Sequence, residues 1–399
     1  MKQPTVHLIE YSPLIGHHLP YLKTLSNRFS EKNHQVKIWV IDEKNKEKLI
    51  QSLTTSELDK LDIQVLKFFF FFKVLLKIGR FVFPNDGHSL GVWGLVKANL
   101  TTQEHEEDLV FMTWLQHSCT RLPKSIRQWI LPRRWMAIDG FAIHSSAVLE
   151  EENFDTYLEG TQGIQIYEED SCQAVLLLNE EMPSILKLRF PNTRFIKFPD
   201  FIEPLNPTDK PDVCQLIRQE ARGRKIFLFV GRMIEKRNFI SFLHLLPYLD
   251  HKQWQVCLIG ELELNLYPKD EQTFIKIQLA SFPEITVQFQ RPGDYELDAL
   301  IESADLLWLA YMNHPHSSNM LTRAAHYKTA VVATSGTLIA HRVIRYEMGL
   351  SVNPYNAISA AKSINNFNPQ LNPFHGYQQY AQQQSIQQID HTLDQVLTP

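Results

Sequence analysis

The segment 226–237 reads IFLFVGRMIEKR, an uncharged apolar run followed by a glycine and a group of charged residues. A run of this length and composition is typical of a strand that is buried on both faces, as in a parallel sheet. Gly231 allows a tight turn, and Arg232 and Lys236 precede a helix that we expect over 238–246. Two cations at the carboxyl end of a strand, beside a helix N-terminus, favour the binding of a diphosphate. A solvated cluster of basic residues after a core strand is the alternative.

The chain has 399 residues, which is long for one hydrophobic core, so two domains are expected. Strands of the first half are predicted at 6–10, 36–41, 109–114, 135–138, 174–178 and 194–198. A helix over 19–32 joins the first two, and this order predicts a parallel sheet. Four prolines between 199 and 211 indicate a linker. Strand and helix then alternate to about residue 365, and a last helix is expected over 377–396.

Further segments of the second half keep the order of one known domain. They lie at 254–260, 285–289, 296–310, 324–334 and 348–354. With Gly-Arg-x-x-Glu-Lys at 231–236, they resemble the C-terminal domain of GT-B glycosyltransferases, in particular the group 1, family-4-like enzymes. The resemblance covers about 226–365 well and 5–40 fairly.

The resemblance implies an α/β fold with two Rossmann-like domains facing a cleft. The implied parts are an acceptor-side domain over 1–203, a nucleotide-sugar-binding domain over 204–370, and a C-terminal loop and helix over 371–399 that packs back on the first domain. The implied activity is a hexosyltransferase-like glycosyltransferase. It would move a sugar from a nucleotide-diphosphate-sugar donor to a glycan or lipid-linked acceptor in a polysaccharide pathway.

The donor is a substrate, so no cofactor is expected. The chain has no Asp-x-Asp, P-loop, G-x-G-x-x-G or H-E-x-x-H motif, so we expect a metal-independent reaction. Arg232, Lys236 and helix-end N–H groups would stabilise the leaving diphosphate, and Gly231 and Gly260 would line the donor site. Two alternatives stay open: a non-catalytic binding or scaffold protein of such a pathway, and an epimerase or phosphorylase of the same fold.

Histidines of the first half are candidates for sugar contacts. Gly16, His17 and His18 follow the first strand, where the family has a glycine-rich loop facing the cleft. Glycine lets a backbone approach a phosphate or sugar closely, and histidine can donate a hydrogen bond to it. His117 stands roughly where relatives place a histidine near the donor sugar, and it would transfer a proton or orient a hydroxyl. The alternatives are ordinary surface histidines or, for His117, other histidines such as His105 and His144.

The chain departs from the family at two acidic positions. Relatives carry two glutamates here, one near the donor sugar and one at the nucleotide ribose, but these positions fall on Pro315 and Arg323. The helix start that remains, with free N–H groups to seat a phosphate, comprises Ser317, Ser318 and Asn319. Arg323 adds a cation that suits a phosphate or an acidic sugar. The alternative is that Arg323 points to solvent and activity is lost.

The segment 68–83 is apolar and aromatic, and Lys73, Lys77 and Arg80 fall on one helical face. This pattern favours an interfacial helix near a lipid-linked acceptor. A buried helix whose basic side chains reach the surface is the alternative.

Composition excludes several other classes of protein. The formal net charge of −4 argues against a general nucleic-acid binder. Four cysteines without a C-x-x-C pair fit a reducing compartment. The N-terminus runs directly into a strand, which predicts no signal peptide, and no apolar stretch is long enough for a transmembrane helix. We therefore expect a cytoplasmic protein with peripheral membrane contact through 68–83.

Overall fold

A computed structural model describes residues 4–14, 16, 18–67, 87–100, 107–115, 122–139, 164–205, 211–314, 316–371 and 374–397. Contacts divide the chain into two units, which are described separately below. The first unit comprises 1–142, 148–199 and 387–399, and the second comprises 143–147 and 200–386. The segment 68–83 and the predicted site residues His17 and His117 lie outside the described residues.

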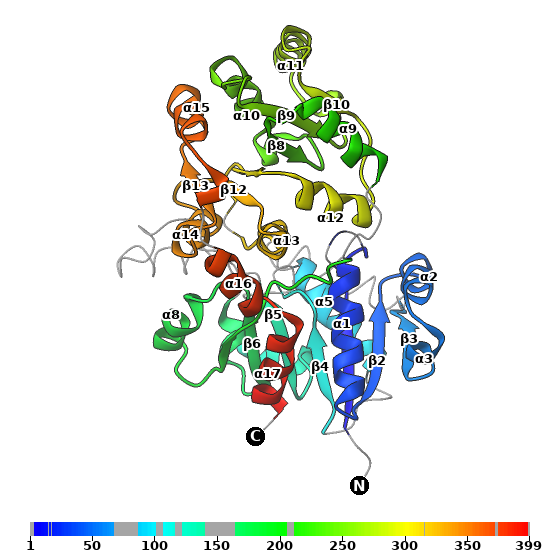
Figure 1. The fold of residues 1–399 in the computed structure, drawn as a ribbon. Coiled ribbons are helices and arrows are strands. Elements are labelled where there is room, and N and C mark those ends of the chain that lie inside the picture. Colours follow the sequence, from blue (N-terminus) through cyan, green and yellow to red (C-terminus); the bar gives the residue numbers. More distant parts are fainter. Residues whose placement is uncertain are drawn as a thin grey trace. The chain divides into compact units, whose positions relative to one another are not determined.

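The first unit contains a seven-stranded sheet in the order β3-β2-β1-β4-β5-β6-β7 (Figure 1). Each described pair of neighbouring strands is parallel. Every residue of β1, β4 and β5 is buried, as expected for inner strands of a parallel sheet. The strands are β1 (Thr5–Glu10), β2 (Gln35–Val40), β3 (Leu61–Val65), β4 (Leu109–Met112), β5 (Trp135–Asp139), β6 (Cys172–Leu177) and β7 (Phe195–Lys197).

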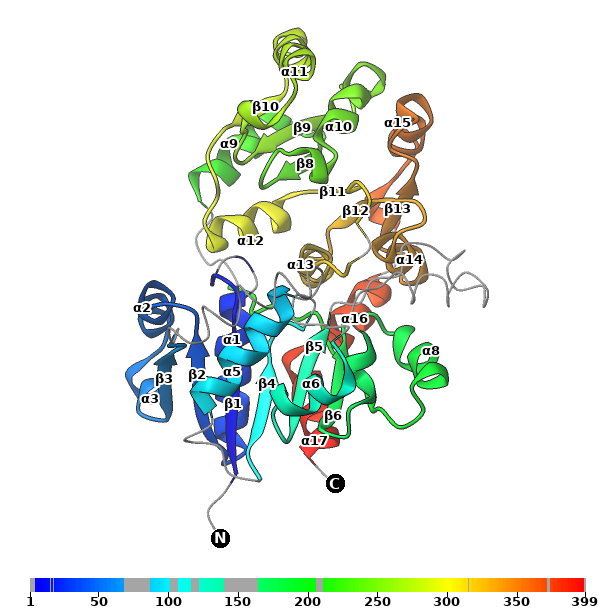
Figure 2. The same ribbon diagram turned by 180° about the vertical axis from the view of Figure 1, so that it is seen from behind.

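Helices cover both faces of this sheet. Figure 1 shows α1 and α17 on one face, and Figure 2 shows α5 and α6 on the other. The apolar side of α1 buries Leu22, Leu25 and Phe29 completely, because their spacing places them on one helical face. The described helices are α1 (His18–Glu31), α2 (Glu43–Ser52), α3 (Thr55–Leu58), α5 (Gly87–Leu100), α6 (Lys124–Ile130), η2 (Ile164–Glu168), α8 (Met182–Arg189) and α17 (Ile386–Leu397).

The second unit contains a six-stranded parallel sheet in the order β10-β9-β8-β11-β12-β13. Its inner strands are buried on both faces, and β8 begins and ends within a residue of the predicted strand 226–230. The strands are β8 (Lys225–Val230), β9 (Trp254–Ile259), β10 (Thr286–Gln288), β11 (Leu306–Leu309), β12 (Ala330–Thr334) and β13 (Gly349–Val352).

Alternation along β8 builds two cores in the second unit. Ile226, Leu228 and Val230 enter one core, whereas Phe227 and Phe229 enter the other, because successive strand residues point to opposite faces. Helices of the first core are α9 (Asp212–Ala221), α12 (Asp294–Ser303), α13 (Asn319–Tyr327), α14 (Leu338–Arg345) and α16 (Phe374–Gln383). Those of the second are α10 (Phe239–Leu245), α11 (Lys269–Ser281) and α15 (Ala357–Asn365). Short turns η3 (Glu235–Arg237), η4 (Leu246–Tyr248), η5 (Leu264–Leu266) and η6 (Pro369–Leu371) complete the unit.

The C-terminal segment differs from its prediction. One helix was expected over 377–396, but α16 ends at Gln383 and α17 begins at Ile386, so that prediction is wrong. Gln384 lies in the break, is 2% exposed, and accepts a 2.7 Å hydrogen bond on its side-chain oxygen from the backbone N–H of Asp200. The helix is interrupted where Gln384 makes this contact with Asp200, which is distant in the sequence. α16 belongs to the second unit, whereas residues 387–399 belong to the first.

Within the first unit, α17 is joined to α1. Arg28 Nη1 lies 3.6 Å from Asp390 Oδ2, and Lys32 pairs with Asp394. Ion pairs as exposed as these contribute little, so the complete burial of Leu393 does more to hold α17.

Strand β3 is the one described strand of the first unit that the sequence analysis did not predict. Its sequence, LDIQV, alternates polar with apolar residues, and only Ile63 is buried. The strand pairs with β2 alone at the edge of the sheet. An edge strand lacks the apolar run that identifies inner strands.

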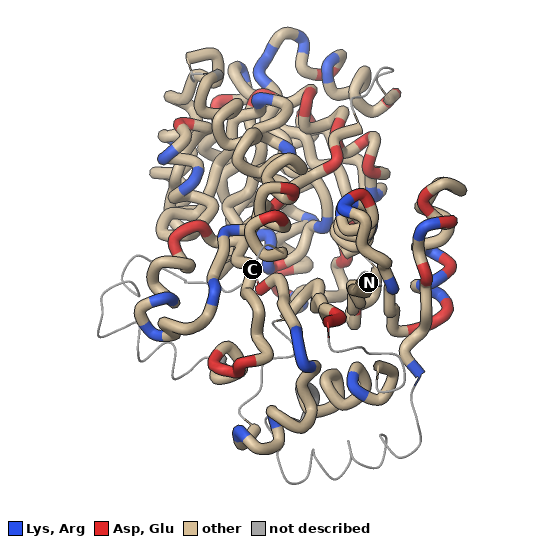
Figure 3. The backbone as a smooth tube through the Cα atoms, turned by 90° about the horizontal axis from the view of Figure 1, so that it is seen from below, with Lys and Arg blue, Asp and Glu red and all other residues tan. Residues whose placement is uncertain are grey.

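Charged residues are interspersed along both units, as Figure 3 shows. Within the described part of the chain, no helix is both long enough and apolar enough to cross a membrane.

Candidate functional site

The order of the second sheet indicates where a ligand binds. β8 and β11 are neighbours, and strand numbers increase outward from this pair in both directions. Crossover connections therefore leave the pair on opposite sides, which opens a crevice outside the carboxyl ends of the two strands. The residues that follow these ends are Gly231 and Arg232 after β8, and Ala310 and Tyr311 after β11.

Two glycines allow the turns after β8 and β9 to touch. The φ angles of Gly231 and Gly260 are +102° and +150°, in the range that side chains disfavour. A Cβ atom on Gly260 would lie 1.9 Å from the carbonyl oxygen of Gly231. The N–H of Glu261 donates a 3.2 Å hydrogen bond to that same oxygen. Close backbone packing therefore requires glycine at 260, independently of the ligand contact predicted for it.

Arg232, a predicted diphosphate ligand, has a partner within the protein. Its Nε donates a 3.0 Å hydrogen bond to Glu263 Oε1, and its Nη2 donates to the same oxygen. This hydrogen bond raises the pKa of Arg232 above its ordinary value. The Arg232 side chain is 47% exposed, so the pair is a surface pair and contributes little to stability. A phosphate would have to replace Glu263.

Lys236, the other predicted diphosphate ligand, lies in the short turn η3. Its carbonyl oxygen accepts a 3.1 Å hydrogen bond from the N–H of Met312, which ties the turn to the segment after β11. The side chain is exposed, and among the described residues its ammonium group has no hydrogen-bond or ion-pair partner. Lys236 is therefore a cation at the switch point of the sheet that is available to an anion.

Arg237 was not predicted as a site residue, but it organises the same region. Its Nη1 donates a 3.0 Å hydrogen bond to the hydroxyl of Tyr311, and its Cζ lies 5.1 Å from the centre of that ring. The same nitrogen lies 3.4 Å from the position of a Cβ on Gly231. The sequence shows three adjacent charged residues at 235–237, but it does not show that Arg237 is the one whose side chain contacts Tyr311.

The start of α13 holds the predicted phosphate seat. Ser318 is the N-cap residue, and its side chain makes no capping hydrogen bond. Ser317 is held differently, because its hydroxyl accepts a hydrogen bond from Nη1 of Arg342, a fully buried residue of α14. The same Arg342 nitrogen lies 3.3 Å from the hydroxyl of Tyr380 on α16. The buried guanidinium of Arg342 therefore holds Ser317, just before α13, by a hydrogen bond.

His314 lies between this loop and the turn η3. Burial, assisted by the positive charges of His316, Lys236 and Arg237, lowers the pKa of His314 to about 4. The imidazole is therefore neutral at pH 7. Its Nε2 donates to the carbonyl oxygen of Ser317 at 3.4 Å, and its Nδ1 is buried without a partner among the described residues. The ring of His314 packs edge-on against that of Tyr311, with 5.1 Å between the ring centres, and Tyr311 also contacts Arg237 of the turn η3.

Arg323 does not point to solvent. Its Nη1 donates to Oδ1 of Asp298 on α12, and the two side chains are 11% and 0% exposed. Oδ2 of Asp298 accepts a 3.0 Å hydrogen bond from the N–H of Leu205. This buried ion pair joins α12 to α13. A donor contact by Arg323, as the sequence predicts, would compete with Asp298.

The first unit has its own switch point between β1 and β4. Glu10, the last residue of β1, is 1% exposed. Its Oε1 accepts a 2.8 Å hydrogen bond from the N–H of Ser12, and its Oε2 accepts one of 2.8 Å from the Thr113 hydroxyl. Nδ1 of His18 lies 3.2 Å from the same Oε2. Gly16, a predicted site residue, lies in the turn between Glu10 and His18 with φ +59°.

Sequence reasoning singled out the turn Gly16-His17-His18 but did not predict that His18 pairs with Glu10. One signal was present, because Glu10 is a carboxylate at the end of a buried strand. Such a group requires hydrogen-bond partners. The sequence did not show which partners the fold supplies.

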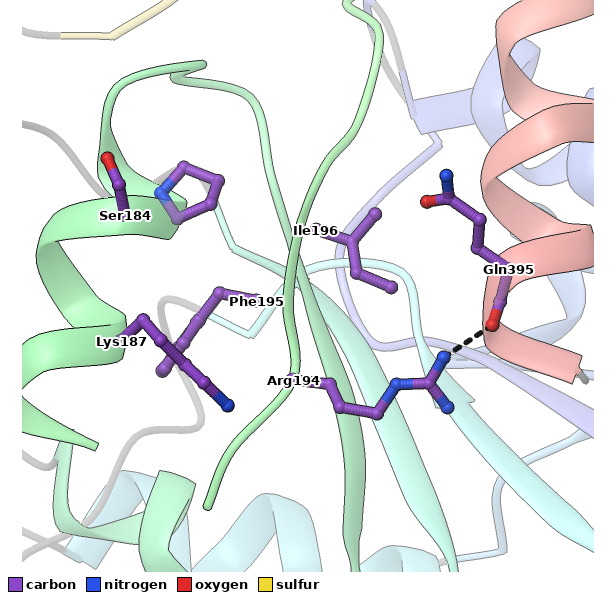
Figure 4. A pocket seen from close by; sticks show the side chains of 7 residues that line it. Ser184, Lys187, Arg194, Phe195, Ile196 and Gln395 are labelled. Atoms are coloured by element: carbon purple, nitrogen blue, oxygen red, sulfur yellow. Dashed lines mark hydrogen bonds between the residues drawn. The ribbon is translucent and has the colours of Figure 1, made fainter. Parts of the chain in front are cut away.

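Two surface pockets of about 490 Å³ each occur in the described part of the chain, and none of the predicted site residues lines either of them. One is in the first unit between α8 and β7. Figure 4 shows Arg194 there, donating to the carbonyl oxygen of Gln395. The other is in the second unit, where Glu235 and Met312 border it beside the Lys236 turn.

No group of three or more His, Cys, Asp or Glu side chains that could hold a metal ion occurs among the described residues. The predicted ligands of the second unit (Arg232, Lys236 and the start of α13) are instead donors that suit an anion.

Two Rossmann-like units, each built on a parallel sheet with a switch point, give the chain the GT-B fold. Residues 216–383 match the family described as "Glycosyl transferases group 1". The second unit therefore carries a group 1 glycosyltransferase domain, as the sequence motifs predicted.

Solved structures of the same fold match nearly the whole chain. Sucrose-phosphate synthase from Thermosynechococcus elongatus is 13% identical, with a TM-score of 0.65 and coverage of 99% of this chain and 98% of that one. WaaG, described as a glycosyltransferase of lipopolysaccharide biosynthesis, is 14% identical with a TM-score of 0.61 and coverage of 98% and 99%. Anabaena HepE, in complex with UDP and glucose, is 13% identical with a TM-score of 0.64 and coverage of 99% and 100%. A comparison with curated protein sequences found no match.

Proposed function

We propose that the protein transfers a sugar from a nucleotide-diphosphate-sugar donor to a glycan or lipid-linked acceptor, without a metal ion. The observation that carries this proposal is the exposed ammonium group of Lys236. It lies at the switch point of a group 1 glycosyltransferase domain and has no partner among the described residues. The Lys236 ammonium group would stabilise the negative charge of the leaving diphosphate, because no carboxylate among the described residues pairs with it.

In this proposal, Lys236 and Arg232 bind the diphosphate in different ways. Lys236 binds the diphosphate directly, whereas Arg232 exchanges Glu263 for a phosphate oxygen when the donor arrives. The N–H groups at the start of α13 add donors that no side-chain cap occupies. Charge that develops on the diphosphate as the sugar leaves is stabilised by these groups in place of a metal ion.

A uridine-diphosphate sugar is the first donor to test, because the HepE structure of the same fold contains UDP and glucose. We propose UDP-glucose as the initial probe, followed by the ADP, GDP and dTDP analogues. An acidic donor such as UDP-glucuronate tests whether Arg323 leaves Asp298 for a carboxylate.

The decisive experiment measures donor affinity by isothermal titration calorimetry for the wild type, Lys236→Ala and a control variant, Lys276→Ala. Lys276 is an exposed lysine of α11. A charge-assisted contact to phosphate is worth about 1.5–3 kcal/mol, so Lys236→Ala should weaken binding at least about tenfold. Lys276→Ala should bind as the wild type does. Equal affinity in all three proteins would remove Lys236 from the donor site.

A non-catalytic binding or scaffold protein is the second candidate. It is favoured by the buried pairing of Arg323 with Asp298, which puts a structural ion pair where the family resemblance places a ribose-binding glutamate. Wild-type protein that binds a nucleotide-sugar but never releases the nucleoside diphosphate from it would support this candidate.

Membrane contact through 68–83 belongs to the proposal as well. The variant Phe69→Ser/Phe72→Ser should lose binding to vesicles that contain anionic lipid, if the segment is interfacial. Wild-type protein that does not bind such vesicles at low salt would remove the membrane from the proposal.

A further inference from the structure

The surface pocket beside α10 lies within the second unit and has a volume of about 490 Å³. α10 packs against α11 and α15, and these three helices contribute to one core of the unit (Figure 1). Residues of α10, α11, the turn η3 and the loop after β13 line the pocket. Its volume is in the range of pockets that hold small organic molecules. Arg232 and Lys236 do not line it, so the pocket is separate from the proposed diphosphate contacts.

Two buried polar side chains of the lining each have an atom without a hydrogen-bond partner. Ser241 of α10 is 8% exposed, and its hydroxyl makes no hydrogen bond within the described part of the chain. Asn238 is 4% exposed, and its Nδ2 donates a 3.1 Å hydrogen bond to the carbonyl oxygen of Ala310. The Oδ1 atom of Asn238 accepts none from the described residues. Because buried polar groups are normally hydrogen-bonded, these two atoms indicate that the pocket receives a hydrogen-bonding ligand.

The lining of the pocket carries negative charge. Glu235 of η3 and Glu271 in the first turn of α11 contribute two carboxylates, and neither has a hydrogen-bond or ion-pair partner among the described residues. His244 also lines the pocket, whereas no described lysine or arginine does. Burial, together with the negative charges of Glu235 and Asp270, raises the pKa of Glu271 above its ordinary value. A cation in the pocket would offset the repulsion between the carboxylates.

The hydrogen-bonding groups of the lining favour one chemical class of ligand. Carboxylate oxygens and the Oδ1 atom of Asn238 only accept hydrogen bonds, and the hydroxyl of Ser241 accepts them as well. A primary ammonium group has three N–H donors, no acceptor, and a positive charge that matches the two carboxylates. A sugar also donates hydrogen bonds, but it carries no charge. The ring of Tyr355, a residue that is 61% exposed, lines the same pocket and suits contact with an ammonium group or its carbon chain.

We propose that this pocket binds a small organic amine through a primary ammonium group. Glu235 and Glu271 supply the negative charge, and Asn238 and Ser241 accept hydrogen bonds from the ligand. The ring of Tyr355 packs on the ligand. The site does not depend on the proposed glycosyl transfer, because none of the residues assigned to the donor lines it.

Calorimetry with 1,4-diaminobutane tests the proposal, and 1,4-butanediol and glucose serve as uncharged probes that donate through hydroxyl groups. The titrations are made in about 0.15 M salt, which screens exposed charges that lie more than about 8 Å apart. The proteins are the wild type, Glu271→Gln, Ser241→Ala and the control Asp270→Asn. Asp270 is the neighbour of Glu271 in α11, is exposed and does not line the pocket, so its substitution changes the net charge equally.

We expect the wild type to bind the diamine at least about tenfold more tightly than the diol, because hydrogen bonds to charged groups are the stronger ones. Glu271→Gln should weaken binding of the diamine at least about tenfold, and Ser241→Ala should weaken it about threefold. Asp270→Asn should stay within about twofold of the wild type, because a screened, exposed charge contributes little. The affinity for UDP-glucose should be the same in all four proteins.

Three outcomes would overturn the amine site. A diamine that binds no more tightly than the diol, or less tightly than glucose, contradicts the choice of an ammonium ligand. Equal weakening in Asp270→Asn and Glu271→Gln would mean that the amine responds to surface charge in general and not to the pocket. If Glu271→Gln does not fold, an unchanged affinity in Ser241→Ala overturns the site. Failure of the wild type to bind UDP-glucose contradicts the proposed function alone, because the diamine titration is independent of it.

Discussion

Nη1 of Arg237 donates a 3.0 Å hydrogen bond to the hydroxyl of Tyr311, and the guanidinium also lies over the same ring, with its Cζ 5.1 Å from the ring centre. Arg237 follows β8 and Tyr311 follows β11, so the contact joins the two strand ends that form the switch point. A 3.1 Å backbone hydrogen bond from the N–H of Met312 to the carbonyl oxygen of Lys236 joins the same two segments. Together they set the position of Lys236, whose own side chain is exposed.

Removal of the Tyr311 hydroxyl tests this arrangement. Tyr311→Phe retains the ring but leaves Arg237 without its hydroxyl acceptor, so we expect a loss of about 0.5–1.5 kcal/mol in the free energy of unfolding in urea. Donor affinity should fall as well, because the Lys236 turn becomes less well ordered. Tyr248→Phe is the matched control, since Tyr248 is 49% exposed. A Tyr311→Phe protein as stable as the control would show that the ring contact alone holds Arg237.

Arg323→Glu introduces the residue type that the family resemblance places at this position. The structure predicts a stability defect, because the new carboxylate would face the fully buried Asp298. Breaking a buried ion pair costs about 3–5 kcal/mol, and the repulsion adds to that cost. Thermal unfolding should show a large fall in Tm, and Asp298→Asn in the same protein should recover part of it. A stable Arg323→Glu protein that binds UDP-glucose more tightly would contradict the structural role.

Stability should depend on pH through His314. Burial lowers the pKa of His314 to about 4, below the value of about 6.5 that the residue has in an unfolded chain. Between these values the unfolded state binds a proton that the folded state does not, so the free energy of unfolding decreases as pH falls through this range. His7, whose pKa is also lowered by burial, acts in the same direction.

The variant His314→Gln isolates this contribution. Its free energy of unfolding should fall less than that of the wild type between pH 7 and pH 5, by about 1–2 kcal/mol. His391→Gln, which alters an exposed histidine, should follow the wild type. Parallel curves for His314→Gln and the wild type would mean that His314 keeps an ordinary pKa in the folded protein.

Gly260→Ala should disrupt the second unit. The added Cβ would lie 1.9 Å from the carbonyl oxygen of Gly231. Because this clash is with backbone atoms, no side-chain rotation can relieve it. We expect a large fall in Tm or a loss of soluble protein. Gly293→Ala is the control, because a Cβ there meets nothing within 4 Å and φ is −67°. A Gly260→Ala protein with wild-type Tm would show that the turns after β8 and β9 can separate.

Much of the architecture could be predicted from local pattern. The apolar run at 226–230 became β8, because burial on both faces of a parallel sheet favours apolar residues. The predicted strand at 6–10 became β1, and the segment 254–260, identified by its resemblance to the family, became β9. The edge strand β3 escaped prediction because it is only partly buried. The predicted single helix over 377–396 is instead two helices, separated at Gln384, which accepts a hydrogen bond from the N–H of Asp200.

The sequence by itself determined the order of strands and helices, the glycine turns after β8 and β9, and the place of the cations after β8, since each of these depends on neighbouring residues. Tertiary structure decided which charges are available. Arg232 pairs with Glu263, Arg323 pairs with Asp298, and Lys236 stays exposed, although all three are basic residues of the same half of the chain. The pair of Glu10 and His18 depends in turn on Thr113, which is 103 residues away from Glu10 along the chain. Such partners are brought together only when parallel strands align their carboxyl ends, because the sheet, and not the sequence distance, sets which side chains meet.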